Sequence, residues 1–447
     1  MDKTIPLVAV CWIALAVMSQ GEAPPAKPTP DVAVEQLVQQ LGDNDYRKRD
    51  AASHALQIAG VRALPALRIA LSHTDAEVRR RASELIPAVE AAVLLAPKRI
   101  TFKTVNKPVK DAFAELIRQT GYQIEYNVND PSRLYSFDFK DAPFWEAVEK
   151  ISRATGLVIQ QGYGDDHIRL YQQNAYAPYV HTEGVFRFTA TGFNQNRNID
   201  FSLAGKGAAP LNRNGSLTLQ FSVCIEPRMA LLGVGEPHLE AAYDNEKNSM
   251  LVPPVNNNEL FNGNVLLSGR WTSGKYGNGN RMFSTQTQAN LLRASEQATT
   301  VKVVRGTLPI MLLVNQKPVV VAEKILEAKG KKTTIGSTQF QIEDVTEQPG
   351  KQYQIKMVVN EDLKDNPNDY SWMNSLVQRI ELQDEKGGKF QITGSQWDNS
   401  AQNHVAMTLT FTTAGGAKAE APTKLIYHTW TTEQHVIPFE FKDLPLP

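Results

Sequence analysis

The spacing of hydrophobic residues changes near residue 174 from a helical period to strict alternation. Between residues 31 and 173, most apolar residues recur every three or four positions, the period of an amphipathic helix. Later segments alternate apolar and polar residues, as half-buried strands do: Leu217–Ile225, Tyr353–Val359 and Val405–Phe411. One-sided alternation favours antiparallel sheets over a parallel sheet with crossover helices. The pattern therefore predicts a multidomain α+β protein.

Residues 31–97 are predicted to form a small helical module. Gly42 and Gly60 end two of its helices, and Thr74–Glu77 is a capping box that begins another. An offset of 30 residues aligns two stretches of this module: Arg49, Ala52, Ser53 and Leu56 onto Arg79, Ala82, Ser83 and Ile86. With the run from Asp75 to Ala82, this repeat resembles the second helix of HEAT repeats, which stack helix pairs. The resemblance implies a HEAT-like module.

Residues 98–173 contain a second repeat, with an offset of 35 residues. It aligns residues of both copies without a gap: Phe102 with Phe137, Pro108 with Pro143, Thr120 with Thr155 and Gly121 with Gly156. Each copy is predicted to be a strand, a helix begun by proline and ended by glycine, and another strand. This duplicated βαβ pattern resembles the short N-terminal module of secretins and TonB-dependent receptors. The resemblance implies a periplasmic domain that binds other proteins.

The C-terminal half is predicted to form two antiparallel β-sandwich-like regions, residues 174–297 and 298–447. Between them, residues 255–281 are rich in Asn and Gly and indicate a long surface loop or a hairpin tip. Segments of this half, such as residues 231–237 and 439–447, are similar to uncharacterised exported bacterial proteins with HEAT-like repeats. That group lends no biochemical function.

The N-terminus indicates export. The apolar run from Ile5 to Met18 is shorter than the roughly 20 residues of a membrane span, and Ser19 and Gly21 place small residues before a cleavage point. Residues 1–21 are therefore predicted to be a signal peptide, with a buried N-terminal helix as the alternative, and residues 22–30 a Pro-rich linker. The mature chain is expected to be periplasmic, envelope-associated or extracellular, without a transmembrane segment.

Composition excludes several classes of protein. The chain has 447 residues, with 47 Lys and Arg against 47 Asp and Glu, and this neutrality argues against a dedicated nucleic-acid binder. Only 2 Cys are present, which excludes a disulfide scaffold and a Cys-rich zinc protein. Cleavage after residue 21 leaves Cys224 alone, on the polar face of its strand. The adjoining domain covers it, or it forms an intermolecular disulfide.

Few residues suggest chemistry. Asp365, Asn368 and Asp369 place oxygen ligands as a calcium loop would, although the segment lacks the glycine and bidentate glutamate of an EF-hand and also reads as a plain turn. His428 and His435 would meet if a hairpin joined them, but no third metal ligand accompanies them. The sequence predicts no cofactor, and no catalytic motif is present.

Two groups of residues suggest interaction. Arg79, Arg80 and Arg81 form a docking patch for an acidic partner or an ordinary solvated helix face. Trp271 and Trp397 are candidates for stacking on sugar rings, with packing inside or between domains as the alternative.

These observations favour a non-enzymatic exported envelope protein whose N-terminal modules bind other envelope proteins. The alternative is a carbohydrate- or cell-wall-binding protein that uses the C-terminal β-sandwiches. A β-sandwich hydrolase is the least favoured class, because the sequence nominates no acid/base pair.

Overall fold

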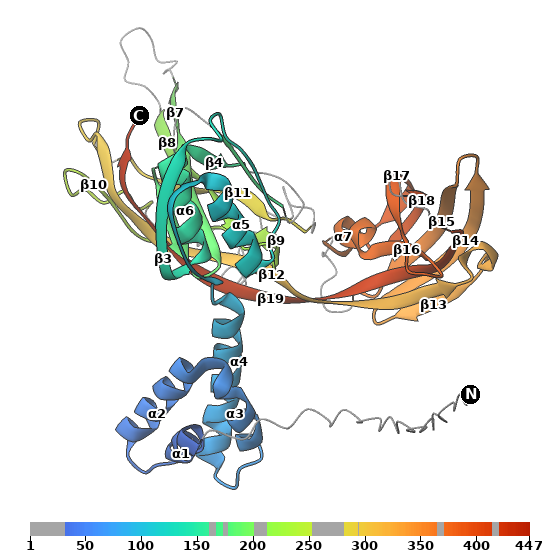
Figure 1. The fold of residues 1–447 in the computed structure, drawn as a ribbon, viewed down its shortest axis with the longest axis horizontal. Coiled ribbons are helices and arrows are strands. Elements are labelled where there is room, and N and C mark those ends of the chain that lie inside the picture. Colours follow the sequence, from blue (N-terminus) through green and yellow to red (C-terminus); the bar gives the residue numbers. More distant parts are fainter. Residues whose placement is uncertain are drawn as a thin grey trace, which may run out of the picture. The chain divides into compact units, whose positions relative to one another are not determined.

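The computed structural model describes residues 32–160, 167–172, 178–200, 212–252, 281–293, 295–363, 371–413 and 420–447 (Figure 1). It confirms a mixed α+β protein whose C-terminal half is rich in β-structure. The chain forms two compact units, Met1–Ala96 and Pro97–Pro447.

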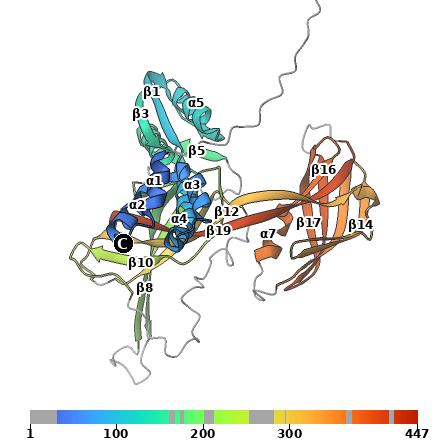
Figure 2. The same ribbon diagram turned by 90° about the horizontal axis from the view of Figure 1, so that it is seen from below.

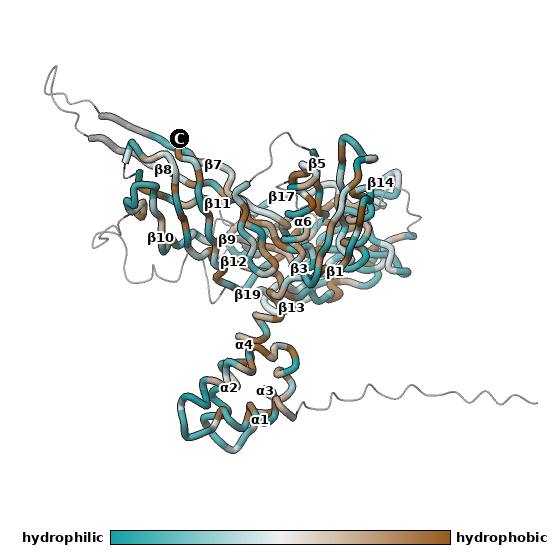
Figure 3. The backbone as a smooth tube through the Cα atoms, turned by 60° about the vertical axis from the view of Figure 1, so that its left-hand side comes forward, coloured by the Kyte–Doolittle hydropathy of each residue, from teal (hydrophilic) through white to brown (hydrophobic). Residues whose placement is uncertain are grey.

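The first unit is helical in its described part. Its elements are α1 (Val32–Gln40), α2 (Tyr46–Ala59), a 3-10 turn η1 (Gly60–Arg62), α3 (Leu64–Ala70) and α4 (Ala76–Leu95). Figure 3 shows hydrophobic residues recurring among polar ones along these helices, and their buried faces form one core around Leu41, Leu56 and Leu67. Asp45 and Asp75 are the N-caps of α2 and α4, and each accepts a hydrogen bond from the backbone N–H two residues later. The helix predicted to begin at Thr74–Glu77 is present, but Asp75 rather than Thr74 caps it.

The second unit begins with the duplicated segment. The first copy is β1 (Arg99–Pro108), α5 (Val109–Thr120) and β2 (Ile124–Asn127), and the second is β3 (Leu134–Pro143), α6 (Phe144–Thr155) and β4 (Leu157–Ile159), followed by β5 (Ile168–Gln172). Both helices begin directly after proline and end at a left-handed glycine, with φ of 74° at Gly121 and 77° at Gly156, as predicted.

The two strands of each copy lie in different sheets. β1 pairs with β3 in an antiparallel two-stranded sheet, and β2 and β4 flank β5 in a three-stranded sheet. The two helices share one core with these sheets, around Phe113, Phe144 and Trp145. Figure 2 shows β1 and β3 side by side with α5 next to them.

The remaining described strands form two further sheets. The elements are β6 (Val180–Glu183), β7 (Phe186–Asp200), β8 (Asn212–Ile225), β9 (Ala230–Val234), β10 (His238–Asp244), β11 (Ser284–Leu291), β12 (Thr300–Glu323), η3 (Ile325–Glu327), β13 (Lys332–Ile335), β14 (Thr338–Gln348), β15 (Gln352–Glu361), α7 (Ser371–Arg379), β16 (Ile380–Asp384), β17 (Lys389–Ala401), β18 (His404–Thr413) and β19 (Pro422–Pro445). One sheet has the order β11-β8-β7-β6. The other has the order β10-β12-β19-β16-β17-β18-β15-β14-β13, and β9 also pairs with β12.

β12 and β19 pair along nearly their whole length of 24 residues, from Thr300↔Pro445 to Glu323↔Lys424. Near the start of β12 this ribbon packs against the four-stranded sheet, where the Phe221 ring lies 5.0 Å from that of Phe439. The other end of the ribbon belongs to a separate core with β14, β15, β18 and α7. Because β12 also pairs with β9 and β10, one sheet crosses the boundary that the sequence predicts between residues 297 and 298.

Gly121 tests the role of the glycine that ends α5. Its φ is positive, yet a Cβ added there would meet no atom within 4 Å, so Gly121→Ala introduces backbone strain without a steric clash. We expect the free energy of unfolding in urea to fall by about 1 kcal/mol. Gly192→Ala is the control, because that residue also has open space but no positive φ, and an equal loss there would contradict the explanation.

Candidate functional site

Arg79 holds the turn that precedes α4. Its Nη1 donates to the backbone oxygens of His73 (2.6 Å) and Thr74 (2.8 Å). Thirty residues earlier, Arg49 Nη1 donates in the same way to the oxygens of Asp43 (2.7 Å) and Asn44 (3.1 Å). The repeat of 30 residues is therefore a repeat of contacts, and Arg79 has a structural role.

Arg80 and Arg81 are also bound within the helical unit. Arg81 is only 12% exposed at its side chain and donates to Glu77 Oε1 (2.7 Å). Arg80 is 52% exposed but lies between Glu77 (2.8 Å) and Glu84 (2.6 Å). Hydrogen bonds from the two arginines lower the pKa of Glu77 to about 2. These contacts favour an ordinary helix face over a docking patch for an acidic partner.

The two histidines do not meet. His428 and His435 lie on the single strand β19, roughly 23 Å apart at about 3.3 Å per residue, so no hairpin brings them together and they are two separate strand histidines. Each is 3.3 Å from its own carboxylate, Glu381 and Glu433 respectively. Asp365, Asn368, Asp369 and Trp271 lie outside the described residues. Within the described part of the chain, no cluster of three His, Cys, Asp or Glu residues is placed to hold a metal ion.

The described tryptophans of the C-terminal half differ in exposure. Trp372 is buried in the core with α7, and its Nε1 donates to Gln402 O (3.2 Å). Trp397, on β17, is 40% exposed. Beside it in sequence, Asp398 accepts hydrogen bonds from Gln396 Nε2 (3.0 Å) and Thr408 Oγ1 (3.4 Å). Trp397 is paired with Met407, whereas Asp398 contacts Thr408, whose side chain faces the other side of the sheet. The exposed Trp397 ring by itself is a surface on which a sugar could stack.

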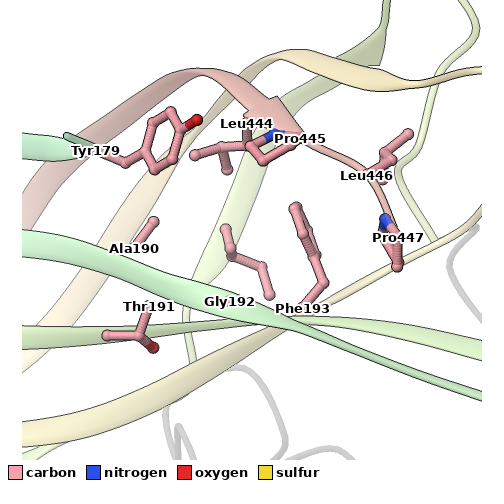
Figure 4. A pocket seen from close by; sticks show the side chains of 10 residues that line it. Tyr179, Ala190, Thr191, Gly192, Phe193, Leu444, Pro445, Leu446 and Pro447 are labelled. Carbon is pink, nitrogen blue, oxygen red and sulfur yellow. The ribbon is translucent and has the colours of Figure 1, made fainter. Parts of the chain in front are cut away.

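A pocket of about 350 Å³ opens between the end of β19 and β7 (Figure 4). Tyr179 and Leu444 lie on one side of it, and Ala190 and Phe193 lie on the other. Tyr179 and Thr191 contribute its only polar side chains. The rest of the lining is apolar or glycine, so the pocket offers mainly apolar contact.

A buried joint connects α6 to the four-stranded sheet. Trp145 Nε1 donates to Val185 O (2.8 Å), and the buried Glu149 forms an ion pair with the buried Arg187. Arg187 also donates to Thr189 Oγ1 (2.6 Å). Because each charge has a partner, the joint escapes the large cost of burying an unpaired charge.

The same joint covers Cys224, which is one of the two alternatives that the sequence leaves open. The side chain is fully buried in the core that surrounds α5 and α6, together with Phe283. Burial raises the pKa of the Cys224 thiol, so the reactive thiolate is disfavoured there. This environment favours a structural cysteine over an intermolecular disulfide.

Glu226 is a second buried charge at this joint. Its carboxylate accepts hydrogen bonds from Tyr122 Oη (2.6 Å) and from the backbone N–H of Lys98 (3.1 Å), and it lies 3.6 Å from Arg228 Nε. Despite these partners, burial raises the pKa of Glu226 above its ordinary value. Through these contacts Glu226 joins segments that are far apart in sequence.

The sheet of β1 and β3 has two strands, and both lie at an edge. Neither strand pairs with any other described strand, so each presents one unpaired backbone edge. Val105 and Leu134 are 57% and 56% exposed at one end of this sheet. Unpaired edges and exposed apolar side chains are features of protein-binding surfaces.

Sequence reasoning missed this edge. The two copies of the 35-residue repeat differ at positions beside the open edge, such as Ala114 against Glu149 and Gln119 against Ala154. A repeat is recognised by the positions at which its copies agree, so these differences attract no notice.

Comparison with known proteins assigns no family, because no family model, curated protein or solved structure matches the chain. Among the described residues, no helix has the length and apolar character that crossing a membrane requires.

The raised pKa of Glu226 predicts a pH dependence. Since the folded state disfavours the ionised carboxylate, this group contributes less stability as the pH rises above its ordinary value of 4.5 and through the folded value. Glu226→Gln cannot ionise, so its free energy of unfolding minus that of wild type should increase as the pH rises from below 4.5 to neutral. Urea unfolding at several pH values measures this difference. The exposed Glu385→Gln controls for the charge change, and a difference that decreases with pH would refute the explanation.

Proposed function

We propose that this chain is a non-enzymatic exported envelope protein that acts as an interaction or scaffold module through its N-terminal modules. One observation carries the proposal: the sheet of β1 and β3 has open edges and an exposed apolar end, while α6, behind it, is fixed to the rest of the chain. A rigidly mounted open edge suits the binding of another protein.

The proposed organisation follows the repeats. Residues 1–21 form the signal peptide, 22–30 the linker, 31–97 a HEAT-like module and 98–173 a module like that of secretins and TonB-dependent receptors. Residues 174–297 and 298–447 form two sandwich-like regions that share the β12–β19 ribbon. The paired contacts of Arg49 and Arg79 support the helical repeat, and the matching caps at Gly121 and Gly156 support the second repeat.

Affinity capture tests the proposal. The chain from residue 22 onward, used as bait in an envelope extract, should retain at least one reproducible partner. A bait carrying both Val105→Asp and Leu134→Asp should lose that partner, because two charges replace the exposed apolar end of the sheet. Trp397→Ala is the matched control and should keep it. Capture of no reproducible partner, or loss with Trp397→Ala alone, would overturn the proposal.

A second candidate function is binding of polysaccharide through β17. The exposed Trp397 ring supports it. It predicts that the protein is retained on insoluble cell-wall polysaccharide and that Trp397→Ala lowers the affinity about tenfold or more, since loss of ring stacking costs about 1–2 kcal/mol. The buried Trp372 is unsuitable as a control, so Val436→Ala, an exposed position on β19, serves instead. Unchanged retention of Trp397→Ala would exclude this candidate.

A further inference from the structure

The outer edge of β1 carries backbone groups that point away from β3. Thr101 shows their direction, because its N–H donates to Gln119 Oε1 (3.0 Å) and its C=O accepts from Gln119 Nε2 (3.0 Å). The side-chain amide of Gln119 thus takes the place of a neighbouring strand. Backbone groups two residues apart along a regular strand point the same way, so those of Lys103 are also directed outward, whereas the register with β3 shifts after Thr104.

A groove of about 670 Å³ runs between this edge and α5. Its helical wall is a stripe of residues spaced three and four apart: Asp111, Ala114, Glu115 and Arg118. The small side chain of Ala114 gives the groove its depth. Glu115 is turned toward the helix, since Arg118 Nη2 lies 2.7 Å from its carboxylate.

The second copy of the repeat shows how an equivalent groove is closed. At the offset of 35, Glu115 corresponds to Lys150, whose Nζ donates to Asp138 O (3.3 Å) and lies over the Phe139 ring. Ala114 corresponds to Glu149, which is tied to Arg187 in the buried joint. Asp138 is both the equivalent of Lys103 and its cross-strand partner, so the outward carbonyl of Asp138 confirms the direction of Lys103. In the first copy, by contrast, the outward groups of Lys103 meet an open groove.

The charged side chains that line the groove favour one kind of binding partner. Lys103 and Lys107 line it on the strand side, and like charges would oppose pairing of this edge with a second copy of itself. Glu115 pairs with Arg118, and Lys103 lies 3.7 Å from its cross-strand partner Asp138. Asp111 also lines the groove. An incoming strand with acidic side chains would therefore find its complementary charge at Lys107 and at the side chain of Lys103, which is 66% exposed.

We propose that the groove between β1 and α5 binds an extended acidic segment of another protein, which adds to β1 as a further strand. The proposal rests on the function proposed above and specifies the site and the partner's chemistry. Backbone hydrogen bonds to the outward groups of Lys103 supply affinity, and the space over Ala114 accommodates alternate side chains.

The probe is a fluorescein-labelled peptide, Thr-Glu-Val-Glu-Val-Glu-Thr, whose binding to the full chain is followed by fluorescence anisotropy. We expect a dissociation constant of about 10–100 μM. Two comparison peptides test the mode of binding: one has alternate residues N-methylated and cannot form a strand ladder, and the other has lysine in place of glutamate. Both should bind at least about tenfold more weakly.

Two variants test the location. Ala114→Trp fills the groove, and Lys103→Pro removes an outward N–H without removing a hydrogen bond to β3. Each should weaken binding at least about tenfold. Ala154→Trp places the same bulk on an exposed position of α6, and Asp138→Pro changes the opposite edge of the sheet. These matched controls should bind within about twofold of wild type.

Several results would overturn the inference: no binding of the acidic peptide up to about 1 mM, equal binding of the N-methylated peptide, or undiminished binding by a folded Ala114→Trp variant. The peptide comparison uses the unaltered chain, so it decides the question even if a variant fails to fold. A partner captured from the envelope and retained by Ala114→Trp would refute the groove while leaving the proposed function intact. Capture of no partner would refute the proposed function itself.

Discussion

The joint between α6 and the four-stranded sheet is the constraint on which the second unit depends. It combines a buried ion pair, Glu149 with Arg187, and the Trp145 hydrogen bond to Val185. A buried pair of charges contributes little net stability, but it tolerates few alternative arrangements, because separating the charges leaves each without a partner. The joint therefore specifies how the duplicated segment is mounted, and Glu226 adds a contact between Tyr122 and the turn after β8.

This constraint explains why two similar copies have different surfaces. In the second copy, α6 directs Trp145, Glu149 and Ser152 into the joint, and all three are buried. The equivalent residues of α5 are Lys110, Ala114 and Ile117, and all three are exposed. Duplication gave both helices the same caps and core, while the outward positions diverged. One copy holds the module in place, and the corresponding face of the other is exposed.

The sequence predicted the elements that local chemistry determines. Proline and glycine at the helix ends and the buried faces of α5 and α6 depend on neighbours close in sequence, so a periodic pattern reveals them. The lengths of β12 and β19 could not be predicted from the sequence. Pro309, Asn315 and Pro318 interrupt the alternation of β12, and the strand is continuous because it pairs with β19. Helix α7 was also missed, since it lies between strands and its buried residues, such as Leu376, belong to a core assembled from distant segments.

The candidate site was harder to predict for a related physical reason. Charged residues that stand out in sequence, such as Arg79–Arg81, are bound by nearby carboxylates and carbonyls. The open edge of β1, by contrast, consists of backbone N–H and C=O groups, which almost every residue type carries. What makes the edge available is the absence of a side chain like Lys150 from one wall of the groove. A small residue such as Ala114 carries no chemical signature of its own. Its significance emerges only by comparison with the copy in which a glutamate at that position is buried, which is why the internal repeat is the most informative feature of this chain.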